Sequence, residues 1–431
     1  MFAVVDGNNM YVSCERAFRP SLKNRPVVVL SSNDGCAVAR SNEAKALGIQ
    51  MGQPWFECRE VAEEYGVVGL SANFPLYADM SDRMMSIAAG LGHTQEIYSI
   101  DECFLDMAGI RGDLVARGQA MRRRILQCIG IPTGIGMGRT KTLAKLANYV
   151  AKTSDRKPGS YPADLARVCN LDILPAADLE AVFQATEVDE VWGIGRRISK
   201  QLHDRGINNV HQLVQMDPAT VRRLWSVVLE RTVRELQGQA CIALEDTPPP
   251  KQEIAHTRSF GQPVRDLHQL CQAVTEYASA AALKLRRQNG RAGQISVFVH
   301  TSPFRPPPHY GRNVVVPLRR PAADTHALVT AALTGLRAIY RPGFDYIKAG
   351  VMLMDLRSSD TEQGELDLEP EPVIRGHLMQ SLDSLNDRFG RGTVTLGSAG
   401  TGGPQRAWSM KQNLLTPAYT TSWADMPVAR A

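Results

Sequence analysis

Three carboxylates stand at the ends of apolar, β-prone runs of the 431-residue chain. Asp6 follows FAVV, and Asp101 and Glu102 lie side by side between YSI and CFLDM. A carboxylate at the end of a buried strand costs desolvation free energy unless a cation lies beside it. Mg²⁺ takes oxygen ligands and shares a few carboxylates with substrate phosphates. The residues therefore predict a site for two Mg²⁺ ions, which activate an attacking hydroxyl and stabilise a leaving pyrophosphate. For Asp101 and Glu102 alone, a polar hairpin turn is the simpler interpretation.

The elements that must position these carboxylates alternate between strands and helices. IYSI and CFLDM predict a hairpin with Asp101-Glu102 as its two-residue loop. This mixture of hairpins and helices predicts an α+β fold and not a doubly wound parallel sheet. The predicted strands are 2–6, 26–30 and TGIGMG (133–138), and the predicted helices are 10–18, 41–48, about 112–128 and 140–152.

The second half of the chain has a different organisation. Residues 165–240 predict helices without strands, and DTPPPK (246–251) reads as a stiff linker. Beyond it, apolar periodicity in 253–356 gives the order strand, helix, strand, strand, helix, strand, which is the split βαβ arrangement. The acidic run 358–372 reads as unstructured.

Charge is unevenly spread along the chain, whose formal net charge is +5. Residues 251–357 carry 15 Lys and Arg against 6 Asp and Glu, a net of +9, and residues 358–431 carry 6 against 9, a net of −3. The basic module favours a polyanionic partner, although a solvated basic face gives the same count. The eight cysteines form no CxxC pair, and no apolar run is as long as a membrane span. With no signal peptide apparent, we expect a cytoplasmic protein with reduced thiols.

Six stretches of the chain form a recognisable set of motifs. They are VVDGNNMYVSCE (4–15), RPVVVLSSNDGCAVARSNEAKALGIQMGQPWFE (25–57), YSIDECFLDM (98–107), GIGMGRTKTLAKLANYVAK (134–152), VWGIGRR (191–197) and RFGRGTVTLGSAG…W…LLTPAYTTSW (388–423). Together these motifs resemble the Y-family DNA polymerases, and within them the UmuC-type enzymes. The resemblance spans nearly the whole chain and implies palm and fingers in 1–165 (fingers about 18–75), a helical thumb in 166–245 and a little finger in 251–357. It implies a clamp-peptide segment and a UmuC-type C-terminal region in 358–431.

The resemblance also implies roles for single residues. Asp6, Asp101, Glu102 and the Gly7 carbonyl would hold the metal ions, and Tyr11 would be the steric gate that excludes a ribonucleotide 2′-OH. From its sequence position alone, Tyr11 could equally be a core aromatic. The residues expected to contact the triphosphate are Asn42, Lys45 and Lys152. The family often has Tyr and Arg at the first two of these positions, and Arg grips phosphate in a bidentate way that Lys does not.

DNA contacts are expected from two regions. Gly193 and Gly195 predict a tight turn whose backbone N–H groups approach DNA phosphates, although a simple helix-end turn has the same pattern. The candidate phosphate contacts of the basic module are Arg258, Arg286, Arg287, Arg291, Arg319 and Arg320. In QGELDL, the residues Gln363, Leu366 and Leu368 resemble a peptide that docks on the sliding clamp; a solvated linker is the alternative.

The combined expectation is error-prone, template-directed DNA synthesis across damaged bases, in SOS mutagenesis. The resemblance implies as partners primer-template DNA, deoxynucleoside triphosphates, a processed UmuD-type dimer, RecA with ATP and the sliding clamp, with nucleoid association when active. Two other classes compete: a nucleotidyl or diguanylate cyclase with a similar palm, and a non-catalytic DNA-binding scaffold. The basic second half argues against the first, and the intact carboxylates argue against the second.

Overall fold

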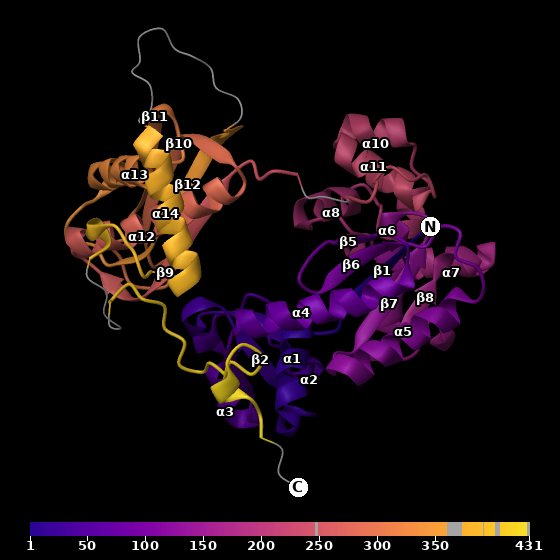
Figure 1. Ribbon diagram of the computed structural model, residues 1–431. Coiled ribbons are helices and arrows are strands. Elements are labelled where there is room, and N and C mark those ends of the chain that lie inside the picture. Colours follow the sequence, from indigo (N-terminus) through magenta and orange to yellow (C-terminus); the bar gives the residue numbers. More distant parts are fainter. Residues whose placement is uncertain (246–248, 360–372, 391, 401–405, 429–431) are drawn as a thin grey trace. The chain divides into compact units, whose positions relative to one another are not determined.

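The structure, a computed structural model, describes residues 1–245, 249–359, 373–390, 392–400 and 406–428 (Figure 1). The chain divides into two compact units. Unit 1 comprises residues 1–31, 35–248 and 414–431, and unit 2 comprises residues 32–34 and 249–413. The domain limits predicted from the sequence remain predictions.

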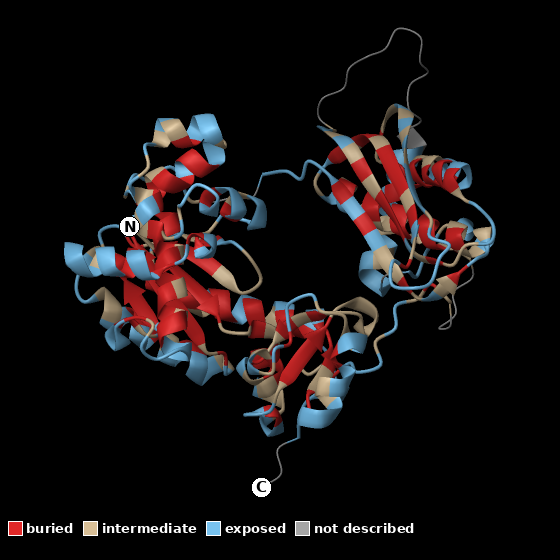
Figure 2. Cartoon of the chain, turned by 180° about the vertical axis from the view of Figure 1, so that it is seen from behind, coloured by how far each residue is buried: buried red, intermediate tan, exposed pale blue. Residues whose placement is uncertain are grey.

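The larger sheet of unit 1 has the strand order β5-β6-β1-β7-β8. Its centre is β1, in which Ala3, Val4 and Val5 are fully buried, and Figure 2 shows the buried residues that run along this sheet. β1 pairs antiparallel with β6 and β7, and β8 pairs parallel with β7. The strands are β1 Phe2–Gly7, β5 Gln95–Ile97, β6 Glu102–Asp106, β7 Thr133–Gly138 and β8 Val168–Asn170.

Helices cover both faces of this sheet. α6 (Lys141–Arg156) packs through Ala144 on the face that carries Val4, and α4 (Phe74–Ala88) and α5 (Leu114–Ile129) pack on the face that carries Ala3 and Val5. The helix starts follow from capping: the Thr140 side chain accepts the Leu143 N–H at the start of α6. The predicted helix 10–18 is confirmed as α1 (Met10–Phe18).

Unit 1 also contains a separate, smaller sheet of order β3-β2-β4. Its core includes Val28, Leu30 and Ile49. Ser41 caps α2 by accepting the Ala44 N–H, so the predicted helix start is confirmed. The elements are β2 Val27–Leu30, β3 Ala37–Arg40, α2 Asn42–Ala46, α3 Arg59–Tyr65 and β4 Val68–Ser71.

Residues 171–240 are helical, as predicted, but the prediction of no strand in 165–240 is wrong. Val168–Asn170 forms β8 and extends the larger sheet by parallel pairing with β7. The strand was missed because three residues are too few to show an alternating pattern. The helices are α7 Ala176–Ala185, α8 Arg196–His203, α9 Val210–Val214, α10 Pro218–Leu224 and α11 Val227–Leu236.

Unit 2 is built on a sheet of order β11-β10-β12-β9. The split βαβ arrangement is confirmed, because β12 lies between β9 and β10, the two strands that α12 connects. α12 and α13 pack on one face, and the other face carries exposed residues such as Val315. α14 (Val373–Phe389) also belongs to this unit. The other elements are β9 Ile254–Val264, α12 Leu267–Arg287, β10 Gly290–Thr301, β11 Gly311–Ala322, α13 Thr325–Ile339 and β12 Tyr346–Ser358.

In the described part of the chain, no helix has both the length and the apolar character needed to cross a bilayer.

Candidate active site

Two of the three predicted carboxylates face each other across paired strands. Asp6, near the end of β1, is the direct register partner of Glu102, the first residue of β6. The predicted two-residue hairpin loop is wrong, because residues 98–101 form the turn and Glu102 belongs to the strand. The N–H groups of Tyr98 and Ser99 both donate to the Glu102 carbonyl oxygen, at 3.1 Å each, which closes this longer turn.

Asp101 is held beside the end of β1 by its backbone. The Gly7 N–H donates to the Asp101 carbonyl oxygen at 2.8 Å. The Ser99 hydroxyl donates to Asp101 Oδ1 at 2.6 Å and so fixes the carboxylate. The structure therefore brings Asp6, Gly7, Asp101 and Glu102 together at one end of the sheet.

One face of α6 supplies the positive charges for these carboxylates. Lys152 forms an ion pair with Asp6, and Lys145 Nζ lies 2.5 Å from Glu102 Oε2. Asn148 donates from Nδ2 to Asp6 Oδ2 at 2.9 Å. Residues 145, 148 and 152 are three and four positions apart, so they share one face of the helix.

Glycines of β7 allow α6 to approach the sheet closely enough for these contacts. A Cβ atom on Gly136 would lie 2.1 Å from the Asn148 backbone nitrogen and 2.3 Å from the Ala144 carbonyl oxygen. A Cβ atom on Gly134 would lie 2.8 Å from Asn148 Oδ1. The TGIGMG strand is therefore rich in glycine because a helix backbone packs directly on it.

Burial and neighbouring charges shift the pKa values of Asp6 and Glu102 in opposite directions. Burial raises the pKa of Asp6 to about 7, against the opposing charge of Lys152 and with a further increase caused by Glu102. Burial also acts to raise the pKa of Glu102, but hydrogen bonds from Asp6 and Lys145 outweigh it, and the pKa is lowered. Asp6 is therefore the more readily protonated of the two carboxylates, and Glu102 the more readily ionised.

The donor set fits divalent cations. Lysine ammonium groups lie next to the carboxylate oxygens of Asp6 and Glu102 and balance their charge. Carboxylate oxygens are also the ligands that a hard divalent cation takes. Among the described residues, no three Asp, Glu, His or Cys side chains already form a group that could hold a metal ion. The side chain of Asp101 bonds to Ser99 and the other two carboxylates bond to lysines.

Tyr11 lies in α1 with its ring in an aromatic group. The ring stacks on Tyr77, with centroids 4.4 Å apart and planes at 13°, and meets Phe74 edge to face at 6.0 Å. Burial raises the pKa of Tyr11, and the charge of Asp101 raises it further, which places the phenol near the carboxylates. The side chain is only partly buried and packs against the hydrophobic core, so the steric-gate role of Tyr11 stays a prediction beside the core alternative.

Asn42 and Lys45 of α2, the predicted triphosphate contacts, form hydrogen bonds with Asn9 in the loop after β1. Asn9 Nδ2 donates to Asn42 Oδ1 at 3.0 Å, and Lys45 Nζ donates to Asn9 Oδ1 at 2.5 Å. Burial lowers the pKa of Lys45 to about 8, and the charges of Arg156, Arg40 and Lys152 lower it further. These cations are therefore close enough to repel one another, and an anion among them would relieve the repulsion.

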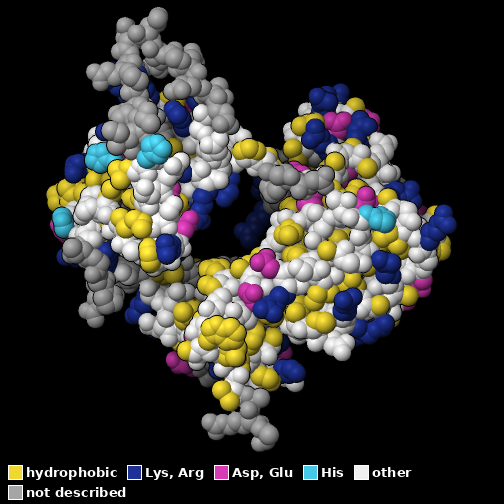
Figure 3. Space-filling model, in the orientation of Figure 1, with side chains coloured by type: hydrophobic (Ala, Val, Ile, Leu, Met, Phe, Trp, Pro, Cys, Tyr) yellow, Lys and Arg dark blue, Asp and Glu magenta, His cyan; other side chains and the backbone are white. Residues whose placement is uncertain are grey.

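Other basic side chains of unit 1 are dispersed. On the face shown in Figure 3, Lys and Arg side chains of this unit are spread among uncharged ones.

The predicted glycine turn is present: Gly193 has a φ of +92°, and Gly195 is the N-cap residue of α8. The positive φ explains why glycine occupies position 193.

Two of the arginines predicted to contact DNA, Arg286 and Arg287, pair with carboxylates of α14. Arg286 pairs with Asp383 of α14 at 2.6 Å and donates to Ala323 and Thr325, contacts that argue against its predicted role in DNA binding. Arg287 lies 2.7 Å from Asp387, and this pair is exposed to solvent.

The strand register separates two further candidates. Arg258 is paired with buried Ala349, which places it on the helix-covered face of the sheet, where it contacts Met410 at 3.7 Å. Arg291 pairs with Arg357, next to the pair of Ala292 and Leu356. Ala292 and Leu356 belong to the core under the helices, so Arg291 lies on the opposite, open face of the sheet. Of the two, only Arg291 is on a face that could meet DNA.

The clamp-peptide residues Gln363, Leu366 and Leu368 lie outside the described residues. The sequence reading missed Asn9, Lys145 and Asn148. The last two could have been found from their spacing to Lys152 on a helix that was predicted correctly. Asn9 could not, because its role depends on α2 packing beside the loop.

Comparisons with known proteins show the family to which the chain belongs. Residues 5–149 match the impB/mucB/samB family, residues 251–367 match its C-terminal domain, and residues 376–429 match a domain of unknown function. The chain is 44% identical to Protein UmuC of Salmonella typhimurium over 430 residues, covering 99% of both chains. It is 42% identical to Protein ImpB of the same species over 434 residues, covering 100% of both, and 41% identical to Protein MucB of Escherichia coli, covering 100% of this chain and 99% of MucB.

Solved structures show the same fold. A chimera of the Y-family DNA polymerases Dbh and Dpo4 matches with a TM-score of 0.64 and 18% identity, covering 83% of this chain and 100% of that chain. The insertion ternary complex of Dbh DNA polymerase matches with a TM-score of 0.51 and 17% identity, with the same coverage. The predicted α+β Y-family fold is therefore confirmed. The chain belongs to the impB/mucB/samB family, the UmuC-type branch of the Y-family, and is a DNA-directed DNA polymerase of error-prone translesion synthesis in SOS mutagenesis.

Proposed function

We propose that this polymerase extends a primer with two Mg²⁺ ions held by Asp6, Asp101, Glu102 and the Gly7 carbonyl. Membership of the family implies a divalent metal cofactor. The observation that carries the proposal is the register pairing of Asp6 with Glu102, each beside a lysine of α6. Divalent cations held by these residues would supply activation of the primer 3′-hydroxyl and stabilisation of the leaving pyrophosphate.

The remaining residues of the site would bind and orient the nucleotide. Lys45 and Lys152 belong to the cationic group whose mutual repulsion a triphosphate would relieve. Asn9 holds Lys45 and Asn42 in position. Tyr11 would lie against the sugar and exclude a 2′-hydroxyl by contact with its ring.

Primer extension with Mg²⁺ and the four deoxynucleotides tests the metal assignment. Asp101→Ala and Glu102→Ala should each abolish extension while primer-template binding stays within about twofold, because these groups would hold metal and not the duplex. Thr142→Val is the matched control and should extend normally, because Thr142 is a buried residue of α6 whose hydroxyl bonds to none of the residues that the structure describes. Near-normal extension by either carboxylate variant would rule out the assignment.

We also propose partners beyond DNA and deoxynucleotides: a processed UmuD-type dimer, RecA with ATP and the sliding clamp. The support is the identity to UmuC over 99% of both chains, together with the sequence of QGELDL. Two buried leucines contribute about 3–6 kcal/mol before ordering costs, so the clamp peptide alone should bind weakly. Leu366→Ala combined with Leu368→Ala should lower clamp-stimulated processivity and leave extension without clamp unchanged. Equal clamp stimulation would exclude the peptide.

A further inference from the structure

Residues 414–428, the last that the structure describes, belong to unit 1 and contact α1, the helix that carries Tyr11. Ser71, the last residue of β4, exchanges two hydrogen bonds with Leu414: the Ser71 N–H donates to the Leu414 carbonyl, and the Leu414 N–H donates to Ser71 Oγ, both at 3.0 Å. Tyr419 stacks on Phe18 at the end of α1, with centroids 4.9 Å apart and planes at 4°. We call residues 414–419 the C-terminal strap.

The strap reaches Tyr11 through a buried carboxyl group. Thr416 is buried and donates from Oγ1 to Glu15 Oε1 at 3.1 Å. Tyr77 donates its hydroxyl to the same oxygen at 2.8 Å. Glu15 is completely buried, and within the described part of the chain its Oε2 has no hydrogen-bond partner, so the two hydroxyls are the contacts that fix its side chain.

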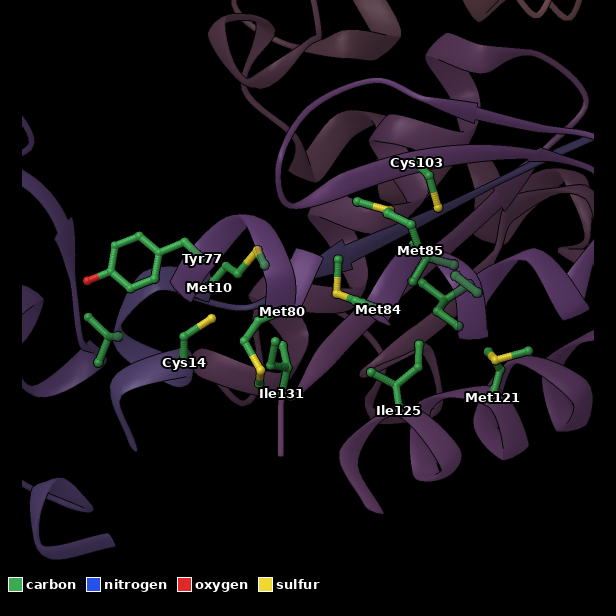
Figure 4. Close-up of a cluster of buried hydrophobic side chains, with 14 of the residues drawn as sticks. Met10, Cys14, Tyr77, Met80, Met84, Met85, Cys103, Met121, Ile125 and Ile131 are labelled. Carbon is green, nitrogen blue, oxygen red and sulfur yellow. The ribbon is translucent and has the colours of Figure 1, made fainter. Parts of the chain in front are cut away.

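Tyr77 in turn supports the ring of Tyr11. Figure 4 shows Tyr77 at the edge of the buried methionine cluster, with its hydroxyl pointing away from the methionines. Its ring is fully buried and stacks on the ring of Tyr11. The hydroxyl contact with Glu15 therefore limits rotation and sliding of the surface on which Tyr11 rests.

The strap also fixes the start of α4, which carries both aromatic neighbours of Tyr11. Asn73 caps α4 by accepting the Leu76 N–H. Its Nδ2 group donates to three oxygens of the strap: Thr416 O at 3.4 Å, Thr416 Oγ1 at 3.1 Å and Pro417 O at 3.1 Å. Phe74 and Tyr77 lie in the first turn after this cap, so one strap residue, Thr416, controls two supports of Tyr11.

We propose that the C-terminal strap is a sugar-selectivity element, in which Thr416 is a positioning residue that keeps Tyr11 rigid. The proposal rests on the proposed role of Tyr11 as the steric gate. A gate excludes a 2′-hydroxyl only if its ring cannot yield, because a shift of about 1 Å removes a van der Waals clash. The proposed role of the strap also gives a function to part of residues 376–429, which match a domain of unknown function.

The experiment measures kcat/KM for a deoxynucleotide and for its ribonucleotide in the full-length protein. Thr416→Val should lower the deoxy-to-ribo selectivity about three- to tenfold, which equals about 0.7–1.4 kcal/mol at 1.4 kcal/mol per factor of ten. Its kcat/KM for the deoxynucleotide should change less than twofold, a split that a general loss of stability would not give. Thr416→Ser should restore selectivity.

Two variants make the outcomes distinguishable. Thr420→Val is the matched control, because Thr420 directly follows the strap and its hydroxyl has no hydrogen-bond partner among the described residues; its selectivity should be unchanged. Tyr77→Phe keeps the ring and removes the contact with Glu15, so it should lower selectivity as Thr416→Val does, and it serves if Thr416→Val is too unstable to assay.

If Tyr11→Ala admits ribonucleotides but Thr416→Val and Tyr77→Phe do not, the strap is only structural and the inference is wrong while the gate assignment stands. If Tyr11→Ala leaves selectivity unchanged, the gate assignment itself is wrong and the inference falls with it.

Discussion

Asp6 and Glu102 are opposite residues of neighbouring antiparallel strands, and Lys152 and Lys145 of one helix neutralise them. The two carboxylates belong to the sheet, and both counter-charges belong to α6. The electrostatic balance of the site therefore depends on how closely this helix packs on the sheet.

Asn148 should be a positioning residue for Asp6. A hydrogen bond to a charged group contributes about 1.5–3 kcal/mol, and its loss in Asn148→Ala should lower kcat for primer extension about 10- to 100-fold. Primer-template affinity should not change, because Asn148 is buried. Single-turnover extension measures the effect, with Thr142→Val as the control on the same helix. A rate equal to wild type would show that Asp6 does not need this contact.

Gly136 should not tolerate a side chain. In Gly136→Ala the new Cβ atom meets backbone atoms of α6 at 2.1 and 2.3 Å, so the helix must move away from the sheet. Overpacking of this kind costs about 3 kcal/mol or more, and the ion pairs of α6 should be weakened at the same time. Urea unfolding checks the change in free energy. Gly376→Ala, at a helical glycine with open space around it, should be neutral or stabilising.

Nucleotide capture should weaken as Lys45 loses its proton. The pKa of Lys45 is lowered to about 8, so the ammonium group is present below this pH and absent above it. We expect kcat/KM for the deoxynucleotide to fall as pH rises through about 8, because this parameter reports ionisations of the free enzyme. Lys45→Arg should move that fall to higher pH, since a guanidinium group stays protonated. An identical pH profile in both proteins would contradict the assignment.

Arg291 and Arg286 of unit 2 should respond differently to substitution by alanine. Arg291→Ala should reduce the salt dependence of primer-template binding by about 0.9 in log–log slope, the value for one lost phosphate contact. Arg286→Ala should leave that slope unchanged and lower the free energy of unfolding by about 3 kcal/mol, because it strands the Asp383 carboxylate. Point variants are needed here, since removal of everything after residue 248 would also remove residues 414–428 from unit 1. The reverse pattern of effects would exchange the two roles.

The sequence predicted the parts of the site that local pattern determines. Asp6 was found because an apolar run ends in a carboxylate, and α6 was found because its cap and periodicity are clear. Glu102 was placed in a turn because its true position depends on pairing with β1, a contact between residues 96 positions apart that a local pattern does not contain. The positions of Arg258 on the helix-covered face and of Arg286 beside Asp383 could not be predicted, because composition counts charges without showing which face of a sheet they occupy. The contact of Thr416 with Glu15 joins residues at opposite ends of the chain, and the family motifs alone gave no sign of it.

The return of residues 414–428 to unit 1 also affects the order of events during translation. Unit 1 contains residues from both sides of unit 2, so the ribosome must synthesise all of unit 2 before the segment that bonds to Ser71, Asn73 and Glu15 exists. A nascent or prematurely terminated chain would have every carboxylate of the proposed metal site but would lack the strap. For a polymerase whose errors are mutations, this arrangement makes the finished site depend on synthesis of the chain through Thr416.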